Sequence, residues 1–307
     1  MEPLNRILRN KFPQQDQNRY RETLQQILAD PDVKNFLNEN REKLSGDFVR
    51  RNASKLYEYA DVKAKIARGE KTFMPGYYPV LHLNGNKLEV LYMPSQKLKR
   101  EKEEKDVQKR ITTISLPKSM KKADLSNYED TPGRDEALNA AVDFARAYLS
   151  NPKEFHKGLY LEGRFGVGKT YLLAGLANVL AKQGVECTLV HFPSFAVQMK
   201  NSIASNNSLD IIDKIKTAPI LMLDDLGADQ MSSWLRDDVL GVILQYRMQE
   251  ELPTFFSSNF NEETLLRQYL TVNNRGESEP LKAQRIMERI KFLATEYHLD
   301  GHDRRNS

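Results

Sequence analysis

The sequence predicts an α/β fold for the larger, C-terminal part of the chain, with a parallel and doubly wound sheet, preceded by a smaller, mainly helical domain that contains a β-hairpin. Residues 157–176, KGLYLEGRFGVGKTYLLAGL, read as an apolar strand, a glycine-rich turn and a long helix. Residues 218–227, APILMLDDLG, form an apolar run typical of a buried parallel strand. Residues 77–94 carry alternating apolar side chains around an Asn-Gly pair, which predicts the hairpin.

Length and charge predict how the chain is divided. At 307 residues it exceeds one average domain, so we expect two. Residues 97–110, KLKREKEEKDVQKR, are dense in charge and poor in apolar side chains. We therefore predict an N-terminal domain at 1–96, a charged linker at 97–134 and the α/β domain at 135–307.

The N-terminal domain is expected to contain short amphipathic helices. Apolar residues recur at helical spacing on both sides of Asp30-Pro31, where proline disfavours helix for the residue before it: Leu24, Ile27, Leu28, Val33, Phe36 and Leu37. In the hairpin we predict a type I′ turn at Asn84-Gly85, because both residue types tolerate positive φ.

The net charge of +4 is unevenly distributed. Residues 1–134 carry 27 Lys and Arg against 19 Asp and Glu, which gives this part +8 and the remainder −4. Two interpretations stay open: a solvated helical surface with a charged linker, or a surface for an acidic protein or nucleic acid.

Several classes of protein are disfavoured by composition. The single cysteine, Cys187, excludes an intramolecular disulfide or a zinc site made of several thiolates within this chain. No stretch approaches the ~20 apolar residues of a membrane span, and the first twenty residues lack an apolar segment of signal-peptide length. We expect a cytoplasmic protein with no membrane partner.

The glycine-rich turn matches the phosphate-loop pattern G-x-x-x-x-G-K-[ST]. Its glycines let the backbone turn tightly and aim N–H groups at phosphate oxygens, and the following helix points the positive end of its dipole at the same anion. Lys169 would lie over the outer phosphates of the nucleotide. The predicted nucleotide-binding residues are Gly163, Arg164, Phe165, Gly166, Val167, Gly168, Lys169, Thr170 and Tyr171.

A second motif lies about fifty residues further on, where the apolar run ends in two carboxylates. Asp224 and the hydroxyl of Thr170 are predicted to bind Mg²⁺. Asp225 is placed to polarise a water molecule against the γ-phosphate of ATP. Asn259 follows another predicted strand, TFFSSN, and could orient that water; the alternative is a turn or helix-cap role, although Asn261 already looks like the next helix start.

From about residue 157 to residue 305 the chain resembles the AAA+ ATPases of the bacterial helicase-loader type, the DnaC/DnaI family. The resemblance rests on the segments GLYLEGRFGVGKTYLLAGLAN, PILMLDDLGAD, SWLRDDVLGVILQYRM, LPTFFSSNF, KAQRIMERIKFLA and LDGHDRR. It implies an AAA+ ATPase that uses ATP and Mg²⁺. It also implies a protein that binds the hexameric replicative DNA helicase through its N-terminal domain and helps to place it on single-stranded DNA during replication initiation or restart. A ring of helicase-bound copies and contacts with other primosome proteins follow from the same resemblance.

The resemblance also implies roles for individual residues. Asn259 matches the sensor-1 position, and Arg289 matches the arginine finger that enters a neighbouring subunit's site, with Arg285 as a nearby candidate. Without the resemblance, Arg285 and Arg289 read as the exposed face of a helix. Arg304 and Arg305 are candidates for the sensor-2 role.

Residues 186–192, ECTLVHF, predict a further strand. The segment between it and the strand that ends in Asp224 and Asp225, residues 193–219, is where related proteins carry a helix that faces single-stranded DNA. Lys200, Lys214 and Lys216 could meet phosphates and Phe195 could stack on a base. The alternative is that Phe195 belongs to the core or to helix packing.

Zinc is not predicted, although relatives commonly carry a cysteine-rich zinc site in the N-terminal domain. The hairpin region of this chain has no cysteine and only His82 as a candidate ligand. His298 and His302 are interpreted as surface residues, because Gly301 would break a helix between them.

Three other classes of function compete with the loader. An origin initiator of the DnaA type should carry a helix-turn-helix domain after the ATPase core, and a nucleotide kinase should carry a lid and acceptor-binding arginines. A transposition-helper ATPase of the IstB type is the strongest alternative.

Overall fold

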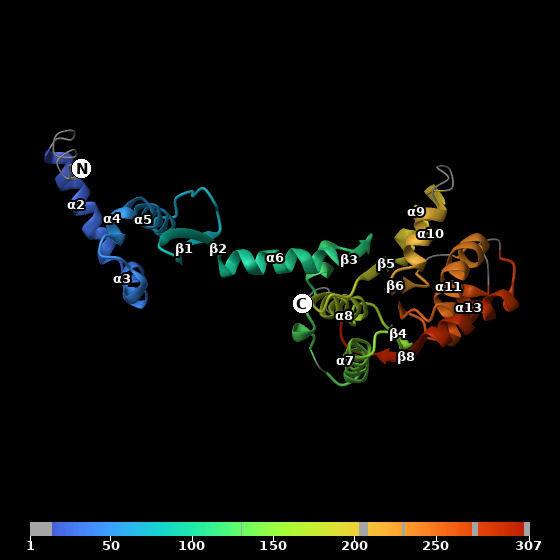
Figure 1. Cartoon of the computed structure of the whole chain (residues 1–307). Helices are drawn as coiled ribbons and strands as arrows, with labels where there is room; N and C mark the ends of the chain where they lie inside the picture. The colour runs from blue at the N-terminus through green and yellow to red at the C-terminus, as the bar shows by residue number, and fades with distance from the viewer. Residues whose placement is uncertain (1–13, 130, 203–207, 229–230, 272–275, 304–307) are drawn as a thin grey trace. The chain divides into compact units, whose positions relative to one another are not determined.

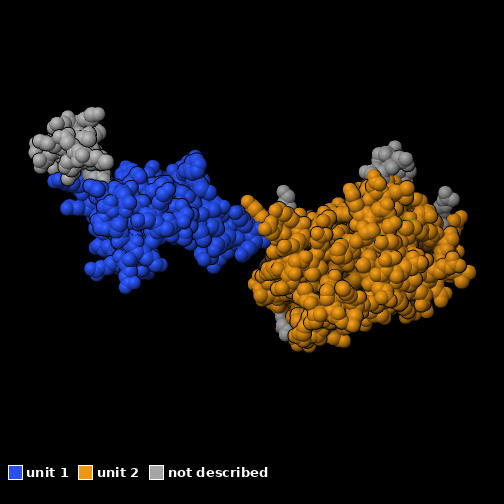
Figure 2. Space-filling model, in the orientation of Figure 1, with its two compact units in different colours: residues 1–103 blue, residues 104–307 orange. Residues whose placement is uncertain are grey.

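The computed structural model describes residues 14–129, 131–202, 208–228, 231–271 and 276–303. The chain divides into two compact units, residues 1–103 and residues 104–307 (Figure 2). The helix α6, Gln96–Lys109, crosses this division and, apart from Gln96, lies within the range 97–134 that we expected to be a linker. None of its described side chains is buried, as its charged sequence implies.

The N-terminal unit is a group of short helices followed by a hairpin. Its helices are α2 (Gln14–Ala29), α3 (Pro31–Glu39), η1 (Arg41–Lys43), α4 (Phe48–Arg51) and α5 (Ala53–Ala67). Asp30 separates α2 from α3 and caps α3, because its carboxylate accepts hydrogen bonds from the backbone N–H groups of Asp32 and Val33. Side chains from these helices and the hairpin form one apolar core: Ile27, Val33, Phe48, Leu56, Tyr59 and Leu88.

The predicted hairpin is confirmed, but its turn is one residue later than expected. The strands β1 (Tyr77–Asn84) and β2 (Lys87–Pro94) are antiparallel, and Asn84 pairs with Lys87, so the loop is Gly85-Asn86. Gly85 has a φ of 59°, whereas Asn86 has no positive φ. This is the pattern of a type II′ turn, so the type I′ prediction is wrong. Asn84 stays in the strand, where its amide donates a hydrogen bond of 2.9 Å to Glu89.

The second unit is built on a six-stranded sheet whose neighbouring strands are all parallel, in the order β3-β5-β6-β7-β4-β8. The strands are β3 (Ile111–Ile114), β4 (Gly158–Gly163), β5 (Cys187–His191), β6 (Ile220–Leu226), β7 (Thr254–Ser258) and β8 (Ala294–Leu299). The glycine-rich turn follows β4, and the two carboxylates lie at the end of β6. The predicted strand TFFSSN is confirmed as β7, which lies between these two strands in the sheet.

Helices cover both faces of this sheet (Figure 1). Strand side chains alternate between two apolar cores: Tyr160 and Leu221 face one, and Leu161 and Met222 face the other. The second core contains α7 (Asp135–Ser150) and α8 (Lys169–Lys182). The first contains side chains of α9 (Phe192–Ser202), α10 (Ser208–Lys216), α11 (Gly241–Gln249) and α13 (Pro280–Leu293). The doubly wound architecture is therefore confirmed. No helix within the described ranges is long and apolar enough to cross a bilayer.

Two strands of the sheet were not anticipated. β3, with the sequence ITTI, lies within the segment expected to be a linker and pairs with β5. β8 contains His298, and residues 294–299 pair with β4 along its whole length, so His298 lies in a strand and not in a helix. His298 and His302 are both exposed, so their interpretation as surface residues is confirmed. The His298 ring is hydrogen-bonded to the Glu162 carboxylate on β4.

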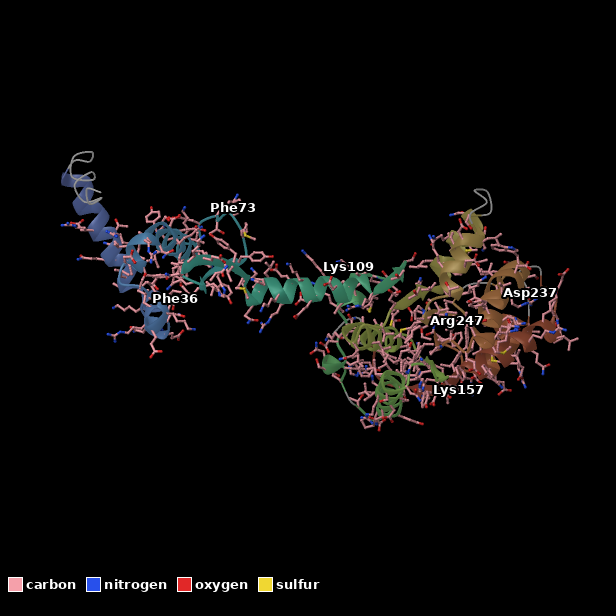
Figure 3. The ribbon with its side chains drawn as sticks, viewed as in Figure 1. Phe36, Phe73, Lys109, Lys157, Asp237 and Arg247 are labelled. Carbon is pink, nitrogen blue, oxygen red and sulfur yellow. The ribbon has the colours of Figure 1, made fainter. Side chains whose placement is uncertain are left out.

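One arginine lies entirely inside the second unit. Arg247 on α11 is 0% exposed and is labelled in Figure 3. Its guanidinium donates hydrogen bonds to the backbone oxygens of Lys216, Ala218 and Pro253 and to the hydroxyl of Thr254. Burial lowers its pKa to about 9. This side chain therefore connects α11 to the segments that lead into β6 and β7.

Candidate nucleotide-binding site

A cavity of about 610 Å³ lies where the predicted motifs meet. The carboxyl ends of parallel strands lie at one edge of a sheet, and this edge is where ligands of doubly wound folds bind. Three groups of residues line the cavity. The phosphate loop contributes Phe165, Gly166, Gly168, Lys169, Thr170 and Tyr171. The ends of β5, β6 and β7 contribute His191, Asp224, Asp225, Ser257 and Asn259. The segment before α7 contributes Leu116, Pro117, Met120, Asn127, Tyr128, Glu129 and Arg134.

The phosphate loop has the backbone that its glycines predict. Gly166 and Gly168 have φ values of 81° and 103°, which side chains with a Cβ rarely adopt. The side chain of Val167 lies in the core at 1% exposure, whereas Arg164 and Phe165 are exposed. Helix α8 begins at Lys169, so its unpaired N–H groups and the positive end of its dipole lie at the loop.

Lys169 is buried and links the loop to the end of β7. Its ammonium donates hydrogen bonds to the backbone oxygens of Gly163 (2.6 Å) and Arg164 (2.9 Å) and to the side-chain oxygen of Asn259 (2.8 Å). The structure therefore brings together two residues that are 90 positions apart in the sequence, both of which we predicted to be in the site.

Thr170 and Asp224 form a pair of oxygen ligands. The hydroxyl of Thr170 donates a hydrogen bond of 2.8 Å to the Asp224 carboxylate, which also accepts one of 2.6 Å from Ser257. Asp224 is 4% exposed, and burial raises its pKa. One carboxylate and one hydroxyl fit Mg²⁺, since this ion is commonly held by one or two protein oxygens together with phosphate and water.

Asp225 is turned into the cavity by an irregular backbone. Its φ is 62°, and the pairing of β6 with β7 shifts register between Leu223 and Leu226. A bulge of this kind re-aims a side chain at a strand end. The Asn259 amide donates a hydrogen bond of 3.2 Å to the Asp225 carboxylate, and the His191 ring lies 3.8 Å from it. The helix cap is Asn261, whose side chain accepts a hydrogen bond from the backbone N–H of Thr264, so Asn259 is not the cap.

Arg289 does not line this cavity. Its guanidinium donates a hydrogen bond of 2.8 Å to the backbone oxygen of Gly241. With Arg285 it lines a separate surface depression of about 740 Å³ on α13. Partial burial, and then the charge of Arg285, lower the pKa of Arg289. Arg304 and Arg305 lie outside the described residues.

The segment that we expected to face DNA contains one buried aromatic residue and three lysines. Phe195 is 0% exposed and belongs to the core, so base stacking by Phe195 is wrong. Phe195 is buried because helix α9 packs on β5 and β6, and burial of an apolar ring is favourable. Lys200 and Lys214 are exposed, while Lys216 is ion-paired with Asp213 at 2.5 Å.

The whole wall of the cavity before α7 and two residues at strand ends were missed from the sequence. His191 and Ser257 are polar residues at the ends of the apolar strands β5 and β7, a signal that could have pointed to them. Arg134 gave no such signal, because it precedes α7 in a segment without a motif. Tertiary structure alone brings it to the loop.

Comparisons with known proteins match both parts of the chain. Residues 1–92 match the family model of the primosomal protein DnaI N-terminus, and residues 121–266 match that of the bacterial DnaA ATPase domain. The replicative helicase loader DnaI of Bacillus subtilis (strain 168) is 37% identical over 317 aligned residues that span 100% of both chains. A crystal structure of DnaI is 44% identical, with a TM-score of 0.56, and covers 65% of this chain and 99% of its own. A candidate primosome component of Streptococcus pyogenes serotype M3 is 45% identical, with a TM-score of 0.55, over 65% of this chain and 98% of its own.

Proposed function

Because the chain belongs to the DnaI family of replicative helicase loaders, we propose that it is an ATP-dependent loader, which binds the hexameric replicative helicase and helps to deliver it onto single-stranded DNA. The observation that carries the ATP-dependent part is the convergence of Lys169, Thr170, Asp224, Asp225 and Asn259 on one cavity. The family assignment and the AAA+ fold support a loader with ATPase activity.

Each side chain has a defined task in this proposal. Lys169 and the loop N–H groups bind the outer phosphates of ATP, and Thr170 and Asp224 hold Mg²⁺. The bound ion supplies positive charge against the phosphate oxygens. Asp225 polarises the attacking water, and Asn259 orients it, since this amide already contacts the Asp225 carboxylate.

The N-terminal unit is assigned to helicase binding. The match of residues 1–92 to the DnaI N-terminal model supports this assignment over a transposition helper of the IstB type. The second unit contains the whole nucleotide cavity. Helicase binding and ATP binding should therefore be separable by truncation.

Removing the N-terminal unit is expected to abolish capture of the helicase. The full chain should retain the hexameric replicative helicase of the same organism in a pull-down, and residues 104–307 should not. ATP binding by residues 104–307, measured by calorimetry with Mg²⁺, is the control that this fragment is folded. Capture of the helicase by residues 104–307 as efficiently as by the full chain would contradict the assignment.

Arg289 is proposed to act on a neighbouring copy of the chain. Its position outside its own cavity suits a residue that completes the site of the next subunit in a ring. A guanidinium is suited to the task because charge spreads over the phosphoryl oxygens in the transition state. Single-stranded DNA, self-association and other primosome proteins belong to the same proposal, with the cytoplasm as its location.

Replacing Arg289 by alanine is expected to leave ATP affinity unchanged and to lower assembly-dependent turnover by about 10³-fold. Turnover should be measured against protein concentration, with helicase and single-stranded DNA present. Arg285→Ala is the matched control on the same helix and should stay close to the unmodified chain. The finger assignment is wrong if Arg289→Ala turns over normally, and it moves to Arg285 if the two results are exchanged.

A further inference from the structure

Arg134 is buried beside the phosphate loop and lines the nucleotide cavity. It is 2% exposed, among the largest fully buried side chains of the described residues. A Cβ added to Gly168 would lie 2.7 Å from Nη2 of Arg134, so the guanidinium lies directly against the loop where α8 begins. No motif assigns this residue to the site.

The charge of Arg134 has no anionic partner among the described residues. One Nη donates a hydrogen bond of 3.0 Å to the backbone oxygen of Glu129, and the guanidinium lies 3.7 Å from the ring centroid of Tyr128. Its Nε is buried and makes no hydrogen bond with any described residue. A buried charge without a counter-charge is costly, and unsatisfied buried donors are rare in proteins. Both features point to an anion that binds from the cavity.

The surroundings of Arg134 indicate which part of a nucleotide it meets. The Asp224 and Asp225 carboxylates and Asn259 lie at the strand ends, where the outer phosphate and Mg²⁺ are proposed to bind. Arg134 belongs instead to the group that includes Tyr128 and the apolar side chains of Leu116, Pro117 and Met120, which suit a base. The guanidinium lies against Gly168 of the phosphate loop and over the ring of Tyr128, so a phosphate that it meets would be on the nucleoside side of the loop.

We infer that Arg134 binds a phosphate group that ATP and ADP share, on the nucleoside side of the phosphate loop. This inference rests on the proposed ATP binding and names one more residue of that site. A guanidinium presents a planar fork of donors that matches phosphate oxygens, so the contact would satisfy Nε and compensate the buried charge.

A contact with a shared phosphate has a distinctive energetic pattern. It is made in the ground state and in the transition state alike, so its loss raises KM and leaves kcat unchanged. ATP and ADP should lose affinity by the same factor. Adenosine, which has no phosphate, should bind Arg134 variants as it binds the unmodified chain.

The test is calorimetric titration of the full chain and of Arg134→Gln with ATP, ADP and adenosine in the presence of Mg²⁺. We expect about 10- to 100-fold weaker binding of both ATP and ADP, and unchanged adenosine affinity. Arg134→Lys keeps a positive charge and should restore part of the affinity. Arg146→Gln on α7 is the matched control, since this arginine is 74% exposed and pairs only with Asp143 among the described residues.

The outcomes separate this inference from the proposed function. If the unmodified chain binds no ATP, the proposed function fails. If it binds ATP and Arg134→Gln binds ATP and ADP equally well, the role of Arg134 is overturned. An equal loss for adenosine, or a loss for ATP alone, also overturns it. Should Arg134→Gln not fold, Arg134→Lys decides: weaker ATP and ADP binding with unchanged adenosine affinity supports the contact, and unchanged affinity for all three contradicts it.

Discussion

Replacing Asp225 by asparagine is expected to lower the rate of ATP hydrolysis by about 10²- to 10⁴-fold, the usual contribution of a positioned base. An amide cannot accept the proton that a carboxylate draws from water. Asparagine also tolerates positive φ, so the backbone at 62° and the contact with Asn259 should survive. Steady-state turnover measures the loss of hydrolysis, and ATP affinity measured on the same preparation shows whether binding is retained.

Lys169→Ala is the comparison that separates binding from chemistry. Its ammonium is the buried cation of the loop, so its loss should abolish measurable ATP binding as well as turnover. Asp225→Asn should retain affinity within a few-fold of the unmodified chain. Rapid hydrolysis by Asp225→Asn would show that another group polarises the water.

Replacing Arg247 by leucine is expected to lower the free energy of unfolding of the second unit by about 3–5 kcal/mol. Leucine fills much of the space but leaves three backbone oxygens and the Thr254 hydroxyl without their buried donor. Urea unfolding followed by the fluorescence of Trp234, the single tryptophan, reports on this unit. A lower midpoint with an unchanged slope would identify lost stability.

Arg267→Leu is the control for the Arg247 experiment. Arg267 is also an arginine of the second unit, but its side chain is 76% exposed and its ion pair with Glu263 lies at the surface. We expect its effect on stability to stay within about 0.5 kcal/mol. An Arg247→Leu chain as stable as this control would mean that the buried hydrogen bonds contribute little beyond the cost of burying the charge.

The parts of the site that could be predicted are those in which a short sequence motif itself contains the residues that carry the chemistry. The phosphate loop needs glycine at Gly166 and Gly168 for its backbone and a cation at Lys169, so its pattern identifies it. The Asp224-Asp225 pair ends an apolar strand, and parallel strands bring such ends to one edge. Asn259 followed from the same argument, and the cavity contains it.

The parts that could not be predicted depend on tertiary contacts. β3 and β8 are short strands whose pairing partners are distant in the sequence, so local periodicity gave no signal. Phe195 has the same aromatic ring whether it stacks on a base or fills a core, and only packing distinguishes the two. Arg134 lies 34 positions before Gly168, and no local pattern connects them.

The pairing of β3 with β5 determines where a shortened chain can begin. A recombinant fragment that starts at residue 135 would lack β3 and would present the outer edge of β5, with its N–H and C=O groups unpaired, as a template for aggregation. The same truncation would delete the wall of the cavity that includes Tyr128 and Arg134. Crystallisation or screening of the isolated ATPase therefore requires a start upstream of Ile111.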